Sequence, residues 1–408
     1  MFNFKWSQWL VLSFFILSAC YMIVLSVTQP YLGIGVNERQ GEWVVTSVHS
    51  GSWGDRHGVP LGGEIHSIND EPPEEHRSVS MFNELEGANS FSIQHNGQET
   101  FYNDIENSSP IHWLLYIVIP ALFFLVILGI SYLVHKRVPK RYSAEQLILF
   151  FLAIATGYLS NSGAVRDDLY GLFLNTGLFL FSPVILIHFL YNYFQELNIY
   201  WFSKKIVYSL YLTVGFVSLL EGYFLTIESY PAFFDPIPGG LLLVLYIISF
   251  FIIYRGLYIH KSAAVGPIFK YMAIGMTIAF FPYIFLYLIP ALAFGVKVIS
   301  LEVGAMFLIA LPITFMYLVT RERLIDIDFV MTRVRYYMIL SVLPSLALMF
   351  TIGWLVEEDL YVISYIQMFL LFQSAFVLFL SVKEVLDFKL QRYLFSARYG
   401  YQESMHRM

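Results

Sequence analysis

The chain has 408 residues, of which 57% are hydrophobic and 13% are charged, and its mean hydropathy is +0.63. Soluble domains contain about 25% charged residues, so this composition excludes an ordinary soluble protein and indicates a membrane protein. The net charge of −6 excludes little, because charged residues in a membrane protein are distributed unequally between the two sides of the membrane. The single cysteine, Cys20, excludes an intrachain disulfide and a cysteine-rich metal site.

Apolar residues occur in blocks of about 20, which suffice to cross a hydrocarbon core of about 30 Å. We therefore predict an α-helical polytopic membrane protein with about ten transmembrane helices. The first helix lies within residues 1–29, where we expect an uncleaved anchor. The predicted spans are 9–29, 111–134, 144–160, 172–193, 205–221, 238–258, 270–289, 299–319, 337–356 and 362–381. Prolines that we expect to kink helices are Pro120, Pro183, Pro282, Pro312 and Pro344.

The distribution of Lys and Arg predicts the orientation, because cytoplasmic loops carry an excess of these residues. With the N-terminus inside, 19 of the 24 Lys and Arg residues fall on the cytoplasmic side. The five outside are Arg39, Arg56, Arg77, Arg166 and Lys297. We therefore predict a multi-pass plasma membrane protein with both termini in the cytoplasm.

Residues 31–107, between the first two spans, are polar and predict a small α/β domain outside the membrane. Residues 42–48 have a strand-like pattern, and glycine-rich turns follow them. The run Leu-Gly-Gly-Glu-Ile-His-Ser-Ile-Asn-Asp at 61–70 completes a pattern that resembles bacterial PDZ domains. This run departs from the family at 63–64 and at Asp70, where aspartate and glycine are favoured, but each departure keeps a turn-compatible residue.

The PDZ resemblance implies a peptide-binding groove. Its carboxylate-binding loop would consist of Tyr31, Leu32, Gly33 and Ile34. Such a groove adds a peptide as a strand and holds its C-terminal carboxylate in backbone amides. Because this loop directly follows Pro30 at the membrane, two interpretations stay open. Either the groove binds a peptide close to the lipid surface, or the domain is a spacer that reports on the helices beneath it.

The sequence contains no recognisable catalytic or metal-binding motif. It lacks the His-Glu-x-x-His pattern of zinc proteases, the Gly-x-x-x-x-Gly-Lys phosphate loop and glycine-rich nucleotide-binding boxes. Only one histidine, His188, lies well inside a predicted span. It is either hydrogen-bonded in the helix packing or a ligand contact.

Two predicted cytoplasmic stretches indicate a function. The first stretch is residues 321–333, which contain Ile-Asp-Ile-Asp-Phe and are followed by Arg335, Tyr336 and Tyr337. The second stretch begins with residues 383–389 and leads to residues 399–404. Together with the span layout and the outer domain, these motifs make the chain similar to the multi-span quorum-sensing sensor histidine kinases of Bacillus. The similarity covers the whole chain and is strongest from 320 to 408.

This resemblance implies a receptor for a secreted isoprenylated peptide pheromone of the ComX type. It also implies a homodimer that signals to a response regulator of the ComA type. Residues 108–381 would form a nine-helix sensor domain and residues 382–408 a cytoplasmic linker helix. We expect the kinase region, with its ATP and Mg²⁺, to lie outside these 408 residues. Membrane lipid is an expected partner, and nucleic acid is not.

A pheromone site is expected at the outer ends of spans four to eight, where aromatic and acidic residues gather. Interfacial aromatic residues are also common simply as anchors or core packing. The candidate residues are Asp167, Asp168, His188, Glu221, Tyr223, Phe224, Tyr230, Phe233, Phe234, Phe281, Tyr283, Phe285, Tyr287, Phe294 and Glu302. The alternative functions are a PDZ-bearing membrane scaffold without kinase output and, less favoured, a transporter.

Overall fold

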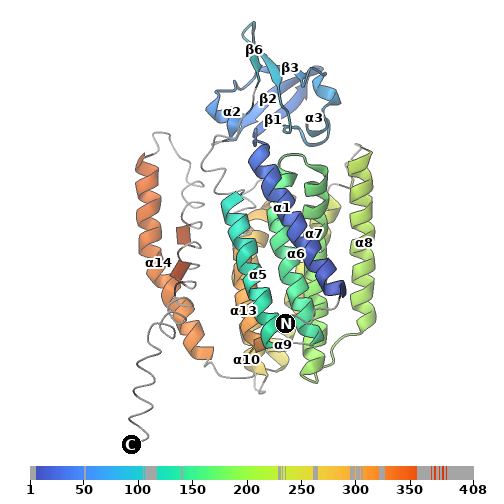
Figure 1. The fold of residues 1–408 in the computed structure, drawn as a ribbon, viewed down its shortest axis with the longest axis vertical. Coiled ribbons are helices and arrows are strands. Elements are labelled where there is room, and N and C mark those ends of the chain that lie inside the picture. Colours follow the sequence, from blue (N-terminus) through green and yellow to red (C-terminus); the bar gives the residue numbers. More distant parts are fainter. Residues whose placement is uncertain are drawn as a thin grey trace, which may run out of the picture.

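In the computed structural model, a bundle of long helices carries a small β domain at one end (Figure 1). We call this end of the bundle the domain end. The structure describes residues 6–49, 52–103, 105, 117–138, 141–227, 231, 233–234, 236–260, 265–294, 299, 304, 307–320, 327–355, 369, 372–373, 376, 379–380 and 383. Tyr230, Glu302, most of the last predicted span and nearly all of the predicted linker at 382–408 therefore lie outside the described residues.

The β domain is built around one antiparallel sheet of six strands. The strands are β1 Ile34–Arg39, β2 Glu42–Val48, β3 Glu64–Ile68, β4 Glu84–Leu85, β5 Phe91–His95 and β6 Gln98–Tyr102, in the order β4-β1-β2-β3-β5-β6. Two short helices, α2 Trp53–Arg56 and α3 Arg77–Phe82, and a 3-10 turn, η1 Pro73–Glu75, complete it. The predicted strand at 42–48 is confirmed.

The sheet buries alternate side chains in a compact core, as the two-residue period of a strand requires. Ile34 and Val36 of β1 lie in this core with Phe91 and Ile93 of β5. Asp70, one of the departures from the PDZ pattern, has a φ of 66°. That left-handed conformation favours glycine but is also open to aspartate, so the turn survives the substitution.

Seven helices among the described residues are long and apolar enough to cross a membrane. They are α1 Trp6–Thr28, α5 Ile119–Arg137, α6 Tyr142–Ala164, α7 Leu169–Glu196, α8 Lys204–Thr226, α9 Pro236–Ile259 and α10 Gly266–Phe281, the last of which continues to Leu288. They confirm the first seven predicted spans. Shorter or less apolar elements overlap the next two spans: η4 Phe307–Ile309, α13 Ala310–Thr320 and α14 Ile327–Leu355. The total of about ten spans stays a prediction.

Helix α6 forms the centre of the bundle and is buried along nearly its whole length. It packs against α1, α5 and α7. Near the domain end, a Cβ atom added to Gly171 of α7 would lie 2.7 Å from the backbone carbon of Gly163 in α6. Glycine at these positions therefore permits the close approach of the two helices, as small residues commonly do in membrane bundles.

Pro282 marks a change of helix geometry in the seventh span. Helix α10 ends at Phe281, and the chain continues as a π-helix, η3, over Pro282–Leu288, followed by α11 Ile289–Phe294. Proline has no N–H to donate in the α-helical pattern, which accounts for a break at this position. The π-helix turns Tyr283 into the core, whereas Phe285 stays exposed.

Candidate functional site

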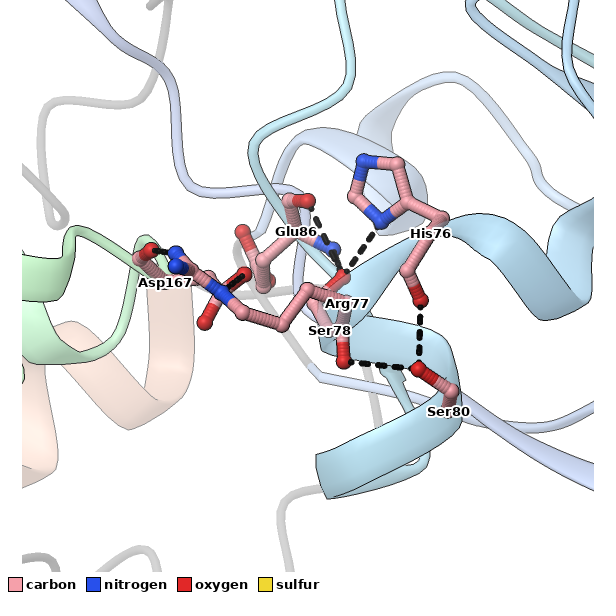
Figure 2. Close-up of polar contacts among 6 residues, drawn as sticks. All are labelled: His76, Arg77, Ser78, Ser80, Glu86 and Asp167. Atoms are coloured by element: carbon pink, nitrogen blue, oxygen red, sulfur yellow. Dashed lines mark hydrogen bonds and ion pairs between the residues drawn. The ribbon is translucent and has the colours of Figure 1, made fainter. Parts of the chain in front are cut away.

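A group of polar side chains forms hydrogen bonds and an ion pair where the β domain meets the turn between α6 and α7. Figure 2 shows Arg77, at the start of α3, reaching across to Asp167 in this turn. The Arg77 Nε donates to Oδ2 of Asp167 at 3.0 Å, and the Arg77 Nη2 donates to the Asp167 backbone carbonyl. The two side chains are only 22% and 9% exposed, so the ion pair is partly shielded from water.

Asp168 connects the start of α7 to α1. Its Oδ2 accepts a hydrogen bond from the Gly171 N–H at 2.7 Å, which makes it the N-cap of α7. Its Oδ1 accepts a hydrogen bond from the Tyr21 hydroxyl of α1, also at 2.7 Å. A carboxylate is favourable at the positive end of a helix dipole. One side chain therefore stabilises the first turn of α7 and fixes α1 beside it.

Arg166, also in the turn between α6 and α7, binds the end of α1. Its side chain is 1% exposed. Its Nε donates to the Gln29 carbonyl at 2.7 Å, and its Nη1 donates to the Ser162 carbonyl at 2.5 Å. The last carbonyls of a helix have no partner within the helix, and a cation there is favourable. Arg166 thus caps α1 from the α6–α7 turn.

Glu86, just after β4, is the buried acid of the β domain, with 2% of its surface exposed. Its Oε2 accepts a hydrogen bond from the Leu32 N–H at 2.9 Å, and its Oε1 accepts one from the Gly33 N–H at 2.5 Å. Burial raises the pKa of the Glu86 carboxyl well above its ordinary value. The two amides and the positive charge of Arg166 oppose that shift without cancelling it.

The backbone of Glu86 is held by α3. The Ser78 hydroxyl donates to the Glu86 carbonyl and accepts from the Glu86 N–H, both at 3.1 Å (Figure 2). The Nδ1 of His76 lies 3.0 Å from the same hydroxyl. Burial, followed by the charge of Arg77, lowers the pKa of His76. These contacts fix the position of Glu86 relative to Arg77, and therefore relative to the α6–α7 turn.

Several aromatic residues of the predicted pheromone site are part of the core. The Tyr283 ring lies 6.1 Å from that of Phe179 and 6.3 Å from that of Tyr246, and Tyr287 stacks on Tyr283 at 5.7 Å. A separate contact joins Phe224 of α8 to Phe234 in an edge-to-face pair at 4.9 Å. Glu221 is also buried on α8. These side chains are already packed against protein.

Four other predicted site residues are largely exposed: Tyr223 (57%), Phe233 (73%), Phe281 (49%) and Phe285 (52%). The rings of Phe281 and Phe285 stack with centroids 4.9 Å apart. Phe294 belongs to α11. An incoming ligand can reach exposed rings without displacing core contacts, so these four are the more accessible part of the predicted set.

Among the described residues, His188 lies apart from the other members of the predicted site. His188 lies 19 positions after the start of α7, or about 28 Å along the helix axis from the domain end. There, its ring nitrogens lie within 3.1 Å of Gln146 Nε2, and its Nδ1 lies 3.3 Å from the Tyr211 hydroxyl. Asn192 donates to Gln146 Oε1 at 2.5 Å. His188 is therefore part of a hydrogen-bonded contact among α6, α7 and α8.

Sequence reasoning did not single out Glu86 or Arg166 as site residues. The sequence predicts Asp167 and Asp168 as possible ligand contacts, and in the structure both connect elements of the chain. Their role in ligand binding stays a prediction. Their partners Arg77 and Tyr21 lie 90 and 147 positions away in the sequence. No local spacing in the sequence indicates such pairs.

The contacts of Arg77, Glu86, Arg166, Asp167 and Asp168 described above connect the β domain and the helices, and we call them the joint. The helices and the joint define a multi-pass membrane protein with a small β domain held at one end of its bundle. No protein-family model and no solved structure matches the chain. The chain is similar to the sensor histidine kinase ComP of Bacillus subtilis (strain 168), with 24% identity over 408 residues. That match covers 96% of this chain and 51% of ComP, so the chain spans about half the length of this curated relative. The resemblance to this kind of sensor is thereby confirmed.

Proposed function

We propose that the chain is the receptor region of a two-component sensor histidine kinase that detects a secreted isoprenylated peptide pheromone in quorum sensing. The observation that carries this proposal is the similarity to ComP, which extends over nearly the whole chain. The kinase step, with ATP and Mg²⁺, and the transfer to a ComA-type response regulator belong in this proposal to a region outside the 408 residues. We further propose that the receptor acts as a homodimer.

Charge and helix direction support an orientation with the β domain outside the cell. Successive helices run in opposite directions, so the ends of α5 and α9 and the start of α8 lie away from the β domain. These ends carry Lys136 and Arg137, Lys204 and Lys205, and Arg255. An excess of such residues is characteristic of the cytoplasmic side. In this proposal the outer domain is PDZ-like, the helices number about ten and both termini are cytoplasmic.

The proposed ligand class places demands on the site. An isoprenyl chain of about 15 carbons gains roughly 10 kcal/mol on leaving water, but the bilayer already supplies most of this. Recognition must therefore come from ring contacts and from polar contacts to the peptide. Exposed aromatic residues near the domain end, above all the stacked pair Phe281 and Phe285, suit such contacts.

A reporter assay in cells that express the protein in its native form tests the proposal. The double variant Phe281→Leu/Phe285→Leu should need about ten times more isoprenylated peptide for a half-maximal response, because a loss of about 1.4 kcal/mol in binding is a tenfold change in affinity. Leucine keeps the positions apolar, so insertion into the membrane should persist. Tyr258→Leu is the matched control, because Tyr258 is 86% exposed at the opposite end of the bundle.

A second double variant, Tyr223→Leu/Phe233→Leu, examines the other two exposed aromatic residues of the predicted site. An unchanged response in both double variants, at equal abundance in the membrane, would exclude these rings as the pheromone contacts. An equal loss in the Tyr258→Leu control would indicate a general effect of removing exposed aromatic residues.

A further inference from the structure

The turn that leads from α1 into the β domain contains a carboxylate site that the chain itself fills. We propose that the Leu32 and Gly33 amides form this site, that its ligand is Glu86, and that this internal ligand fastens the β domain to the helices. The domain would then be closed to peptide C-termini. This inference is independent of the pheromone proposal, because it rests on the contacts of Glu86 and of the turn at Leu32 and Gly33.

The geometry of the turn is that of an anion-binding loop. Two successive backbone N–H groups point at one carboxylate, each reaching a different oxygen. Such convergent amides are a recurrent way to bind carboxylate and phosphate groups. Gly33 has a φ of +63°, and an added Cβ atom would lie 2.5 Å from the Ser52 Cβ. The turn therefore requires glycine in order to present its amides in this way.

Glu86 is held in place from its own side as well. The Ser78 hydroxyl bonds both backbone polar groups of Glu86, and the side chain is 2% exposed. If the carboxylate left the turn, two buried N–H groups would lose their partners, which is unfavourable because neither protein nor water would replace these hydrogen bonds. Glu86 is thus a built-in occupant rather than a side chain that rests in an open groove.

The filled turn adjoins the contacts that hold the helices at the domain end. α1 ends at Thr28, four residues before Leu32, and Arg166 binds the carbonyl of Gln29 between them. A Cβ atom added to Gly87, next to Glu86, would lie 3.4 Å from the Arg166 carbonyl. The turn, Glu86 and the α6–α7 turn therefore form one continuous contact.

Two consequences follow for the domain. A peptide C-terminus would need the same N–H groups that Glu86 occupies, so this loop does not capture peptides. The alternative function, a PDZ-bearing scaffold, depends on such capture and therefore loses its main support. A displacement of α1, α6 or α7 is instead carried directly to the sheet. Of the two interpretations that the sequence left open, the structure favours a domain that reports on the helices beneath it.

Rescue by a small carboxylate tests the site in the whole chain in lipid nanodiscs. Glu86→Ala should lower the thermal unfolding midpoint of the β domain, because it leaves the two amides unpaired. Sodium formate, titrated to about 100 mM, should raise that midpoint saturably and recover much of the loss, since a ligand of the folded state stabilises it. Sodium chloride at equal concentration corrects for ionic strength. The wild type and Glu84→Ala, which changes a neighbouring acid outside the turn, should show no rise above the chloride control.

A folded Glu86→Ala variant that gains nothing from formate, or a wild type that gains as much, would overturn the proposal. A second measurement does not depend on any variant. Hexapeptides ending in a free Val, Leu, Phe or Ala carboxylate, and their amidated versions, are titrated against the wild-type chain. We expect no carboxylate-dependent binding. Binding by the wild type that disappears on amidation would show that the loop is open and would contradict the internal ligand.

Discussion

Glu86 is buried against two amides, and its titration provides a prediction at the level of one residue. Its pKa lies well above the ordinary 4.5 because burial disfavours the charged form, with Glu84 adding to the shift and Arg166 opposing it. An acid whose pKa is raised by folding stabilises the fold fully below its unfolded pKa, and this contribution is lost as the pH rises through the folded pKa. The β domain should therefore lose stability from this group as the pH rises from about 4.5.

Comparison of wild type with Glu86→Gln isolates this effect. The lowered pKa of His76 acts in the opposite direction, because folded-state stability from this group is lost as the pH falls below 6.5. His76 is present in both proteins, so the difference in thermal midpoint between them reports Glu86. We expect the midpoint of the wild type relative to Glu86→Gln to fall between pH 4.5 and pH 8. A difference that does not depend on pH would show that Glu86 has the same pKa in the folded and unfolded states.

The ion pair between Arg77 and Asp167 links α3 of the β domain to the α6–α7 turn, and its strength can be measured. A double-mutant cycle with Arg77→Ala and Asp167→Ala should give a coupling free energy of about 1 kcal/mol, because the pair is only partly shielded from water. The hydrogen bond from Arg77 to the Asp167 backbone persists in Asp167→Ala, so Arg77→Ala alone should cost more than Asp167→Ala alone. Thermal unfolding in nanodiscs measures all four proteins. Additive single effects would show that the side-chain contact contributes nothing.

At the scale of elements, the contact between α6 and α7 depends on glycine. Gly171→Ala would place a Cβ atom 2.7 Å from backbone atoms of Gly163, and a backbone cannot move aside as a flexible side chain can. We expect a loss of about 2 kcal/mol in the free energy of unfolding, typical of overpacking. The measurement is the unfolding midpoint of the purified chain in detergent.

Gly177→Ala is the matched control for this substitution. Gly177 lies on the same helix, and an added Cβ atom there meets nothing within 4 Å. Alanine forms helix better than glycine, so this variant should be as stable as the wild type or more stable by up to about 1 kcal/mol. Equal losses in both variants would mean that the effect of Gly171→Ala does not come from contact with α6.

The spans were predictable because each requirement is local in the sequence. About 20 apolar residues must follow one another to cross a bilayer, and the first seven predicted spans coincide with helices of the structure. The strand at 42–48 was predictable for the same reason, since its pattern repeats every two residues. The π-helix after Pro282 was predicted only as a kink, because the sequence does not show how neighbouring helices accommodate the missing N–H.

The joint was not predictable, because its partners lie far apart in the sequence. Glu86 meets amides 53 and 54 positions away, and Arg166 meets a carbonyl 137 positions away. Arg166 contributed to the sequence analysis only as a positive charge outside the membrane, although it is almost fully buried. Charge counts predict sidedness, whereas only the fold determines whether a given charge faces water or caps a helix.

For the whole molecule, these contacts join the β domain and the helices α1, α6 and α7 into one unit. The four exposed aromatic residues of the predicted site lie on α8, α10 and the segments that follow them. A ligand bound there would act on helices that pack against α7 and α9. His188 and its partners lie about 28 Å further along α7, between the domain end and the opposite end of the bundle.

The proposed receptor function is tested most directly by peptide binding to the purified chain in nanodiscs. A ComX-type peptide is prepared with and without the isoprenyl group on its tryptophan, and each form is titrated against the chain and against empty nanodiscs. We predict saturable binding of the isoprenylated form beyond its partition into empty discs, and much weaker binding of the unmodified form. If the folded chain binds neither form more than the empty discs do, it is not a receptor for this class of pheromone.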